Sequence, residues 1–150
     1  MTYLWSDAWL LQAIALAAAE RPATLSEIIG CADALNHALP TRDELHGAFA
    51  RLTAGGFVEE LENRFQLTSS VSAESRLRLV SGGLQARRRA ASKLLDAETW
   101  TAETNVRDPR NAVLYAGLTD ERIRRSEAEY RRRVRSRQTT PRTRPSRQRD

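Results

Sequence analysis

Arginine is concentrated near the end of this 150-residue chain, in a segment whose pattern predicts a helix from about Asp120 to Arg137. Seven of these arginines are candidates for binding the phosphates of nucleic acid: Arg124, Arg125, Arg131, Arg132, Arg133, Arg135 and Arg137. Each guanidinium presents a planar fork of donors that matches a phosphate group, and its charge attracts a polyanion. A solvated helix face is the alternative interpretation, because only a thin apolar line accompanies the arginines.

The last twelve residues, TTPRTRPSRQRD, contain no hydrophobic side chain, two prolines and four arginines. Such a composition cannot bury apolar surface, so we expect residues 138–150 to form a basic tail that is disordered in isolation. Nucleic acid is a better partner for it than a membrane, because no wide apolar face accompanies the charge. A tail that only keeps the protein soluble is the alternative.

Residues that could support catalysis are few. The chain has two histidines, His37 and His46, and one cysteine, Cys31, with no spacing typical of a metal site. Cys31 and His37 are predicted to lie on different sides of one helix. The Gly-Gly pairs lack the Lys and Ser or Thr of a phosphate-cradling loop. We therefore predict no enzyme activity, no cofactor and no metal.

The net charge of +5 conceals a strong asymmetry. Residues 1–70 hold four arginines and nine acidic residues, a net charge of −5, and residues 71–120 have a net charge of +2. Residues 121–150 hold twelve arginines and four acidic residues, a net charge of +8. The positive charge that could attract nucleic acid therefore lies at the C-terminus.

The first predicted helix runs from about Asp7 to Glu20, with Ser6 as its N-cap. Its apolar run from Ala8 to Ala19 covers twelve residues, too few to span a bilayer, and no basic residue precedes it as in a secretory signal. Apolar side chains surround most of this helix, so we expect it to lie in the core. A seam between two subunits is the alternative.

Two capping boxes predict the next two helices. Thr24 with Glu27 begins a helix over 25–37, and Thr41 with Glu44 begins a helix over 42–54. Gly55 and Gly56 then supply a residue of positive φ that ends the second of these helices.

A short β-hairpin is predicted directly after the glycines. Its strands cover 57–61 and 65–67, and a three-residue loop of Glu62, Asn63 and Arg64 joins them, with Asn63 in the left-handed conformation.

This succession of helices and hairpin resembles the winged helix-turn-helix domains of bacterial regulators. The residues that carry the resemblance are Glu44, Leu45, Leu52, Gly56, Phe57, Val58, Phe65, Leu67 and Thr68. It implies a mainly α fold with a small β-hairpin (α+β), in which C-terminal helices follow a winged helix-turn-helix. It also implies DNA binding, for which Arg42, His46, Arg51 and Arg64 are the candidate contacts in this region.

The surface of the 42–54 helix differs from that of a typical DNA-reading helix. Asp43, Gly47, Ala50 and Ala54 are predicted to point away from the core, which offers one carboxylate and three small residues to base edges. A ridge of small residues lets another helix approach closely. Gly47, Ala50 and Ala54 are therefore candidates for contact with the protein's own C-terminal part or with a second subunit.

The rest of the chain divides at Thr68 and Leu118. We expect residues 1–70 to form the winged helix-turn-helix domain and residues 71–118 a helical extension packed on it, with helices over 73–80 and 84–98. The connection over 100–113 shows no period and is predicted to be pinned by Trp100 and Tyr115. The arginine-rich helix over 119–137 follows.

These features predict a non-enzymatic winged-helix protein, a DNA-associated transcriptional regulator whose affinity is aided by the basic C-terminal tail. The alternative is a protein-interaction or dimerisation module that does not read DNA specifically. Duplex DNA and a second copy of the chain are the predicted partners, and no membrane is expected. The lone cysteine makes a reducing, cytoplasmic location the simplest expectation.

Overall fold

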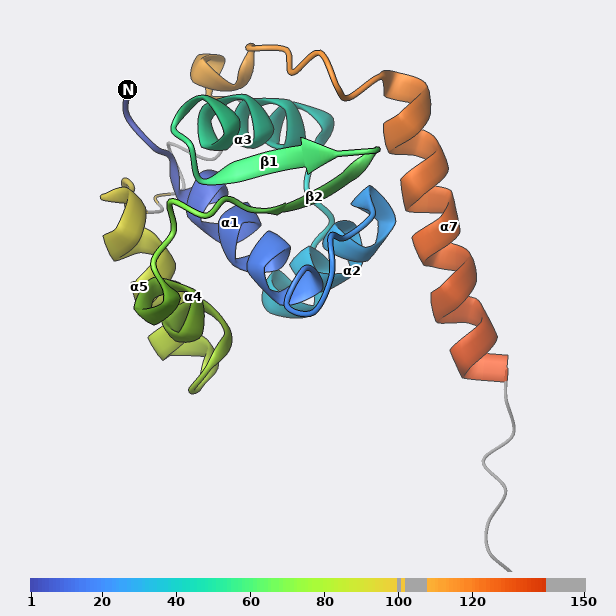
Figure 1. The fold of residues 1–150 in the computed structure, drawn as a ribbon. Helices are drawn as coiled ribbons and strands as arrows, with labels where there is room; N and C mark the ends of the chain where they lie inside the picture. Colours follow the sequence, from blue (N-terminus) through green and yellow to red (C-terminus); the bar gives the residue numbers. More distant parts are fainter. Residues whose placement is uncertain (100, 102–107, 140–150) are drawn as a thin grey trace, which may run out of the picture.

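The computed structural model describes residues 1–99, 101 and 108–139, so Trp100 and residues 140–150 of the predicted tail lie outside the described residues. The first two residues of that tail, Gln138 and Thr139, are helical, so the predicted boundary at 138 was wrong. The chain folds into helices with a single two-stranded antiparallel hairpin, which confirms the predicted α+β class (Figure 1). The elements are α1 (Trp5–Ala17), α2 (Leu25–Asn36), α3 (Arg42–Ala54), β1 (Val58–Leu61), β2 (Arg64–Leu67), α4 (Ala73–Val80), α5 (Leu84–Leu95), the 3-10 helix η1 (Pro109–Asn111) and α7 (Asp120–Thr139).

Helices α2 and α3 begin where their capping boxes predicted. Thr41 Oγ1 accepts the Glu44 N–H at 3.2 Å, and Glu44 Oε2 accepts the Thr41 N–H at 2.8 Å. Thr24 and Glu27 make the same reciprocal bonds at 3.2 and 2.9 Å. After α3, Gly56 has a φ of 78°, the left-handed value that the chain reversal requires.

Helix α1 begins two residues earlier than predicted, and the assignment of Ser6 as N-cap was wrong. Leu4 is the N-cap residue, and Asp7 Oδ2 accepts its N–H at 2.8 Å. A carboxylate in the first turn thus accepts the N–H of the N-cap residue itself, and it is favoured by the positive end of the helix dipole. The helix ends at Ala17 rather than Glu20.

The hairpin has a two-residue loop, not the predicted three-residue one. Glu62 and Asn63 both have positive φ, 49° and 64°, and Arg64 already pairs with Leu61 in the sheet. Two left-handed residues match the right-handed twist of the flanking strands. An isolated bridge joins Phe65 to Ala23, so the connection between α1 and α2 is tied to β2.

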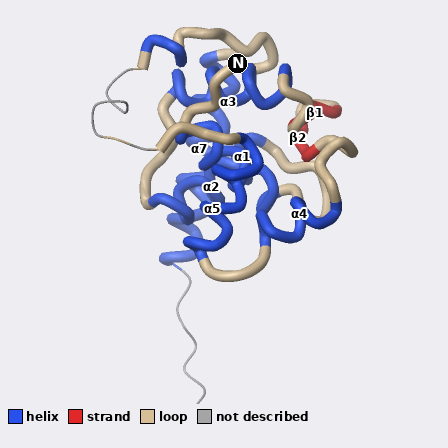
Figure 2. Tube along the Cα trace, turned by 90° about the vertical axis from the view of Figure 1, so that its left-hand side faces the viewer, coloured by secondary structure: helices blue, strands red, loops and turns tan. Residues whose placement is uncertain are grey.

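Helix α1 forms the centre of the core. Leu10, Leu11, Ala13 and Ile14 are fully buried among α2, α3, α4 and α5, which confirms the predicted core position over a subunit seam. The hairpin and α4 lie along one edge of the molecule (Figure 2). Helix α5 ends at Leu95, three residues before its predicted end. No helix within the described ranges is long and apolar enough to cross a bilayer.

Helix α7 lies on the outside of the molecule beside α2 (Figure 1). Ile123 is buried, and the Tyr130 ring packs against Gly30 of α2. The Tyr130 hydroxyl donates to Asp33, and this hydrogen bond raises the pKa of Tyr130 to about 12. The thin apolar line of α7 therefore docks the helix, as the sequence indicated, and leaves most of its arginines outside.

Candidate functional site

Two surfaces could contact nucleic acid, the outward face of α3 and the outward face of α7. The first is covered around His46, Gly47 and Arg51 by residues 108–119, which we call the covering segment. It runs over α3 from η1 to the start of α7 (Figure 1). This segment therefore determines which side chains of α3 are accessible to DNA.

Arg51 is held inside the protein by four hydrogen bonds. Its Nε and Nη2 donate to the two carboxylate oxygens of Asp7 at 2.6 and 2.8 Å. Its Nη1 donates to the Arg110 carbonyl at 2.9 Å, and Nη2 also donates to Asn111 Oδ1 at 2.7 Å. Only 9% of the Arg51 side chain is exposed, and Asp7 is fully buried. Arg51 joins α3 to α1 and to the covering segment and has no surface left for DNA.

His46 is likewise buried. Its Nδ1 accepts the backbone N–H of Tyr115 at 3.1 Å, while its Nε2 has no hydrogen-bond partner in the described part of the chain. Burial lowers the pKa of His46, and the nearby Arg42 charge lowers it further, against the opposing influence of Asp120 and Asp43. A neutral imidazole is required here, since a protonated Nδ1 could not accept this bond.

Tyr115 anchors the covering segment as the sequence predicted. Its ring lies 6.0 Å from that of Phe49, and its hydroxyl donates to Glu60 Oε2 at 2.9 Å. Burial raises the pKa of Tyr115, and its hydrogen bond to Glu60 adds to the effect. The segment is thus attached to Phe49 in the core and to Glu60 of the hairpin.

Of the small residues of α3, Gly47 is the one that contacts the covering segment. A Cβ atom built at Gly47 would overlap Asn111 Oδ1 and lie 2.7 Å from Arg51 Nη2. Ala50 is half-buried, and Ala54 is exposed. Of the two occupants predicted for the ridge, the protein's own C-terminal part covers Gly47.

Arg42 and Arg64 are the two exposed arginines of this region. Arg42 pairs with Asp120 at the start of α7 and with Asp43 at 3.2 Å, so acidic groups match its charge. Arg64 donates to the Pro22 carbonyl at 3.3 Å. Of the four candidates in this region, His46 and Arg51 are therefore inaccessible, which corrects their assignment as DNA contacts in this structure.

Two arginines of α7 attach the helix to the domain. Arg122 Nη1 donates to Glu60 Oε1 at 2.7 Å, Nη2 donates to the Asn63 carbonyl at 2.7 Å, and its Cζ lies 5.0 Å from the Phe65 ring centre. Arg133 donates to the Ser26 carbonyl at 3.1 Å and to Glu129 at 3.3 Å. Arg133, a predicted DNA contact, is half-buried and thus has mainly a docking role.

The other α7 candidates form an open basic face. Arg125 pairs with Glu121 at 2.8 Å. The remaining ones are exposed and make no ion pair with any described residue: Arg124, Arg131, Arg132, Arg135 and Arg137. Four of them line a shallow hollow of about 390 Å³ along the helix, together with Glu127 and Ala128. We call the four arginines of this hollow the α7 basic face, because Arg137 lies on the other side of the helix, in line with Tyr130 and Arg133.

Within the described ranges, no group of three or more His, Cys, Asp or Glu side chains could hold a metal ion. Comparison with protein-family models, curated proteins and solved structures gave no match.

Proposed function

We propose that this chain is a non-enzymatic, DNA-associated regulator of the winged-helix type that holds duplex DNA through the phosphate backbone. The observation that carries the proposal is the contrast between its two surfaces. The α7 basic face is exposed and unpaired among described residues, whereas His46, Gly47 and Arg51 of α3 lie under the covering segment.

The spacing of the α7 basic face suits a backbone contact. Arg124, Arg131 and Arg135 are seven and four residues apart, so they share one side of the helix. They span about 16 Å along the axis at 1.5 Å per residue. Duplex DNA of that length carries about ten phosphate charges. Several charge contacts can form at once without any base edge being read.

The rest of the chain leaves this charge available. Near the start of α7, Glu60 of the hairpin pairs with Arg122, and Asp120 pairs with Arg42. The negative charges of these two carboxylates are therefore neutralised by contacts within the protein. Four more arginines follow in residues 140–150 of the sequence. Binding of this kind gains its free energy from counterion release and depends steeply on salt.

The proposal predicts that the four arginines of the α7 basic face supply most of the DNA affinity. In the full chain, the combined change Arg124→Gln, Arg131→Gln, Arg132→Gln and Arg135→Gln should lower the log–log salt slope of binding by about 3 to 4. The affinity at low salt should fall by at least about a hundredfold. Fluorescence anisotropy of a labelled duplex measures both quantities.

A matched control removes the same charge elsewhere. Arg21, Arg78, Arg89 and Lys93 are exposed and distant from α7 in the chain, and their combined replacement by Gln should change the slope far less. An equal loss of DNA affinity in both variants would show that net charge alone attracts DNA and would contradict a site on α7. A third variant, with Arg142, Arg144, Arg147 and Arg149 changed to Gln, measures the share contributed by the tail.

The second candidate function is a protein-interaction or dimerisation module. Its supporting observation is on the covering segment, where Val113 and Leu114 are 50% and 66% exposed. Light scattering on the full chain tests it. A dimer that Val113→Ser with Leu114→Ser returns to a monomer, together with no DNA binding, would favour this candidate over the first.

A further inference from the structure

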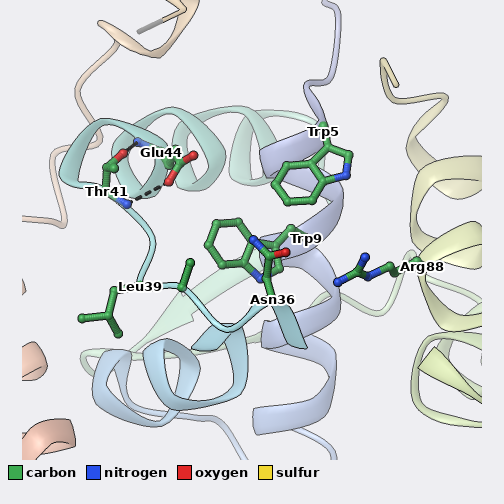
Figure 3. Close-up of a pocket in the computed structure, with 8 residues that line it drawn as sticks. Trp5, Trp9, Asn36, Leu39, Thr41, Glu44 and Arg88 are labelled. Carbon is green, nitrogen blue, oxygen red and sulfur yellow. Dashed lines mark hydrogen bonds between the residues drawn. The ribbon is translucent and has the colours of Figure 1, made fainter. Parts of the chain in front are cut away.

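A cleft of about 520 Å³ opens between α1, the α2–α3 connection and α5 (Figure 3). Its lining includes Trp5, Trp9, Asn36, Leu39, Glu44 and Arg88. The volume falls in the range of small-molecule sites, and the lining combines aromatic surface with a few polar groups, as such sites usually do.

Two indoles form the wall of the cleft. Trp5 and Trp9 lie 5.6 Å apart between ring centres, tilted by 35°. Trp9 is fixed from behind, because its Nε1 donates to the Ala32 carbonyl at 3.0 Å. Trp5 is only half-buried and faces the cleft from the first turn of α1. A preformed aromatic surface of this kind binds a flat apolar ring.

Hydrogen-bond donors gather at the α5 side of this wall. Arg88 lines the cleft, and only its Nη2 is used within the described residues, in a bond to the Leu35 carbonyl at 2.7 Å. Arg88, Trp5 and Trp9 also line a small adjoining cavity of about 20 Å³. Gln12, 1% exposed, lines that cavity too, and its Nε2 has no hydrogen-bond partner in the described part of the chain.

A ligand that used these groups would carry an acceptor at one end. A guanidinium has five N–H donors, and a carboxylate accepts two of them in parallel. Glu44 of α3 lines the opposite part of the cleft, and its Oε2 already accepts the Thr41 N–H. A second anionic group is disfavoured there, because it would lie next to this carboxylate. Charge thus orients the ligand with its acid group toward Arg88.

We propose that this cleft binds a planar aromatic carboxylate, with its ring against Trp5 and Trp9 and its carboxylate at Arg88. The proposal uses none of the arginines of α7. It can therefore hold or fail independently of the DNA contact.

Isothermal titration calorimetry of the full chain with 2-naphthoate tests the site, and 2-naphthamide serves as the neutral probe of the same shape. Naphthoate should bind saturably with one site per chain, and naphthamide should bind at least about tenfold more weakly. No binding of naphthoate at millimolar concentration, or equal affinity for the two probes, would overturn the proposal.

Variants locate the contact. Arg88→Gln should weaken naphthoate at least about tenfold and leave naphthamide unchanged, since the lost interaction is with the charge. Arg89→Gln, at the exposed neighbouring arginine, is the matched control and should change neither affinity. Trp5→Leu should weaken both probes. If Arg88→Gln does not fold, as judged by circular dichroism, Arg88→Lys replaces it. The lysine keeps the charge, so this variant should still bind naphthoate more tightly than naphthamide, and equal affinities would refute the site. Full naphthoate affinity in a folded Arg88→Gln protein would refute the site.

Discussion

Arg51 lies where α1, α3 and the covering segment meet, and its pair with Asp7 is the most buried ion pair among the described residues. Such a pair stabilises a protein little compared with a well-packed apolar pair, but removing one partner leaves an uncompensated charge in the interior. The remaining contacts of Arg51 are neutral oxygens of Arg110 and Asn111, which cannot replace the carboxylate.

Asp7→Asn should therefore lower the free energy of unfolding by about 3 kcal/mol, although the new side chain has nearly the same shape. The double change Asp7→Leu with Arg51→Met should lose less than the single change, because neither charge is left alone. Urea denaturation measures both values. Glu74→Gln, which breaks the exposed pair with Arg78, is the control and should cost less than about 1 kcal/mol. An unaltered stability in Asp7→Asn would contradict this account of the pair.

His46 predicts how stability depends on pH. Burial and the Arg42 charge lower the pKa of His46 in the folded protein, so the unfolded chain binds the proton more tightly. The contribution of the neutral imidazole is therefore complete above the unfolded pKa of about 6.5 and is lost as the pH falls below it.

Urea denaturation between pH 7.5 and 5.5 should show this decline, and His46→Asn should remove it, since an amide oxygen can still accept the Tyr115 N–H at any pH. The carboxyls whose pKa is lowered, such as Glu27 and Asp120, titrate below this range. A pH dependence in His46→Asn equal to that of the original protein would show that another group is responsible.

The sequence showed which face of the 42–54 helix points outward, but not what lies on it. His46 and Arg51 bond to residues 69 and 44 to 60 positions away, and no local pattern marks such partners. Arg88, whose partner Leu35 is 53 positions away, was missed for the same reason. Tyr115 was anticipated as an anchor together with Trp100, which lies outside the described residues, because an aromatic in an irregular stretch usually finds a core to pack against.

At the scale of elements, boundaries were predictable where a signal is local. The capping boxes of α2 and α3 and the left-handed Gly56 are set by side chains within four residues of the helix end. The start of α1 was missed, because Asp7 reaches back to Leu4 and extends the helix. The hairpin loop was missed because Glu62, a residue that seldom adopts positive φ, does so here.

Gly47 tests the packing between α3 and the covering segment. Gly47→Leu should lower the free energy of unfolding by about 1–3 kcal/mol, because its side chain would displace Asn111 and break the bond from Arg51. Ala54→Leu, at an exposed position of the same helix, should change it by less than about 0.5 kcal/mol. Chemical denaturation of both variants measures the difference.

The smaller change Gly47→Ala separates helix propensity from packing. Alanine favours a helix interior over glycine by about 1 kcal/mol, yet its Cβ would overlap Asn111 Oδ1. The change should therefore be more favourable in an Asn111→Ala protein than in the original chain. Equal effects in the two proteins would mean that Asn111 does not limit the space at Gly47.

At the scale of the whole molecule, the charge asymmetry of the sequence becomes an arrangement in space. The acidic first part of the chain meets the start of α7 through Glu60 and Arg42 and its middle through Asp33. Arg124, Arg131, Arg132 and Arg135, unpaired among the described residues, lie on the open side of the same helix. The total charge of each part could be read from the sequence, but this division of α7 into a docked side and an open side could not. It depends on contacts such as Arg122 to Glu60, which are 62 residues apart.

The central claim is that α7 and not α3 contacts DNA, and a ¹⁵N–¹H correlation spectrum of the full chain titrated with a 20-base-pair duplex tests it most directly. We predict that amide signals of α7 from Arg124 to Arg137 shift as duplex is added. Those of α3 and the Tyr115 amide bonded to His46 should stay in place. Shifts concentrated in residues 43–54, with loss of the Tyr115 signal from its original position, would contradict the account. They would show that the covering segment leaves α3 when DNA binds.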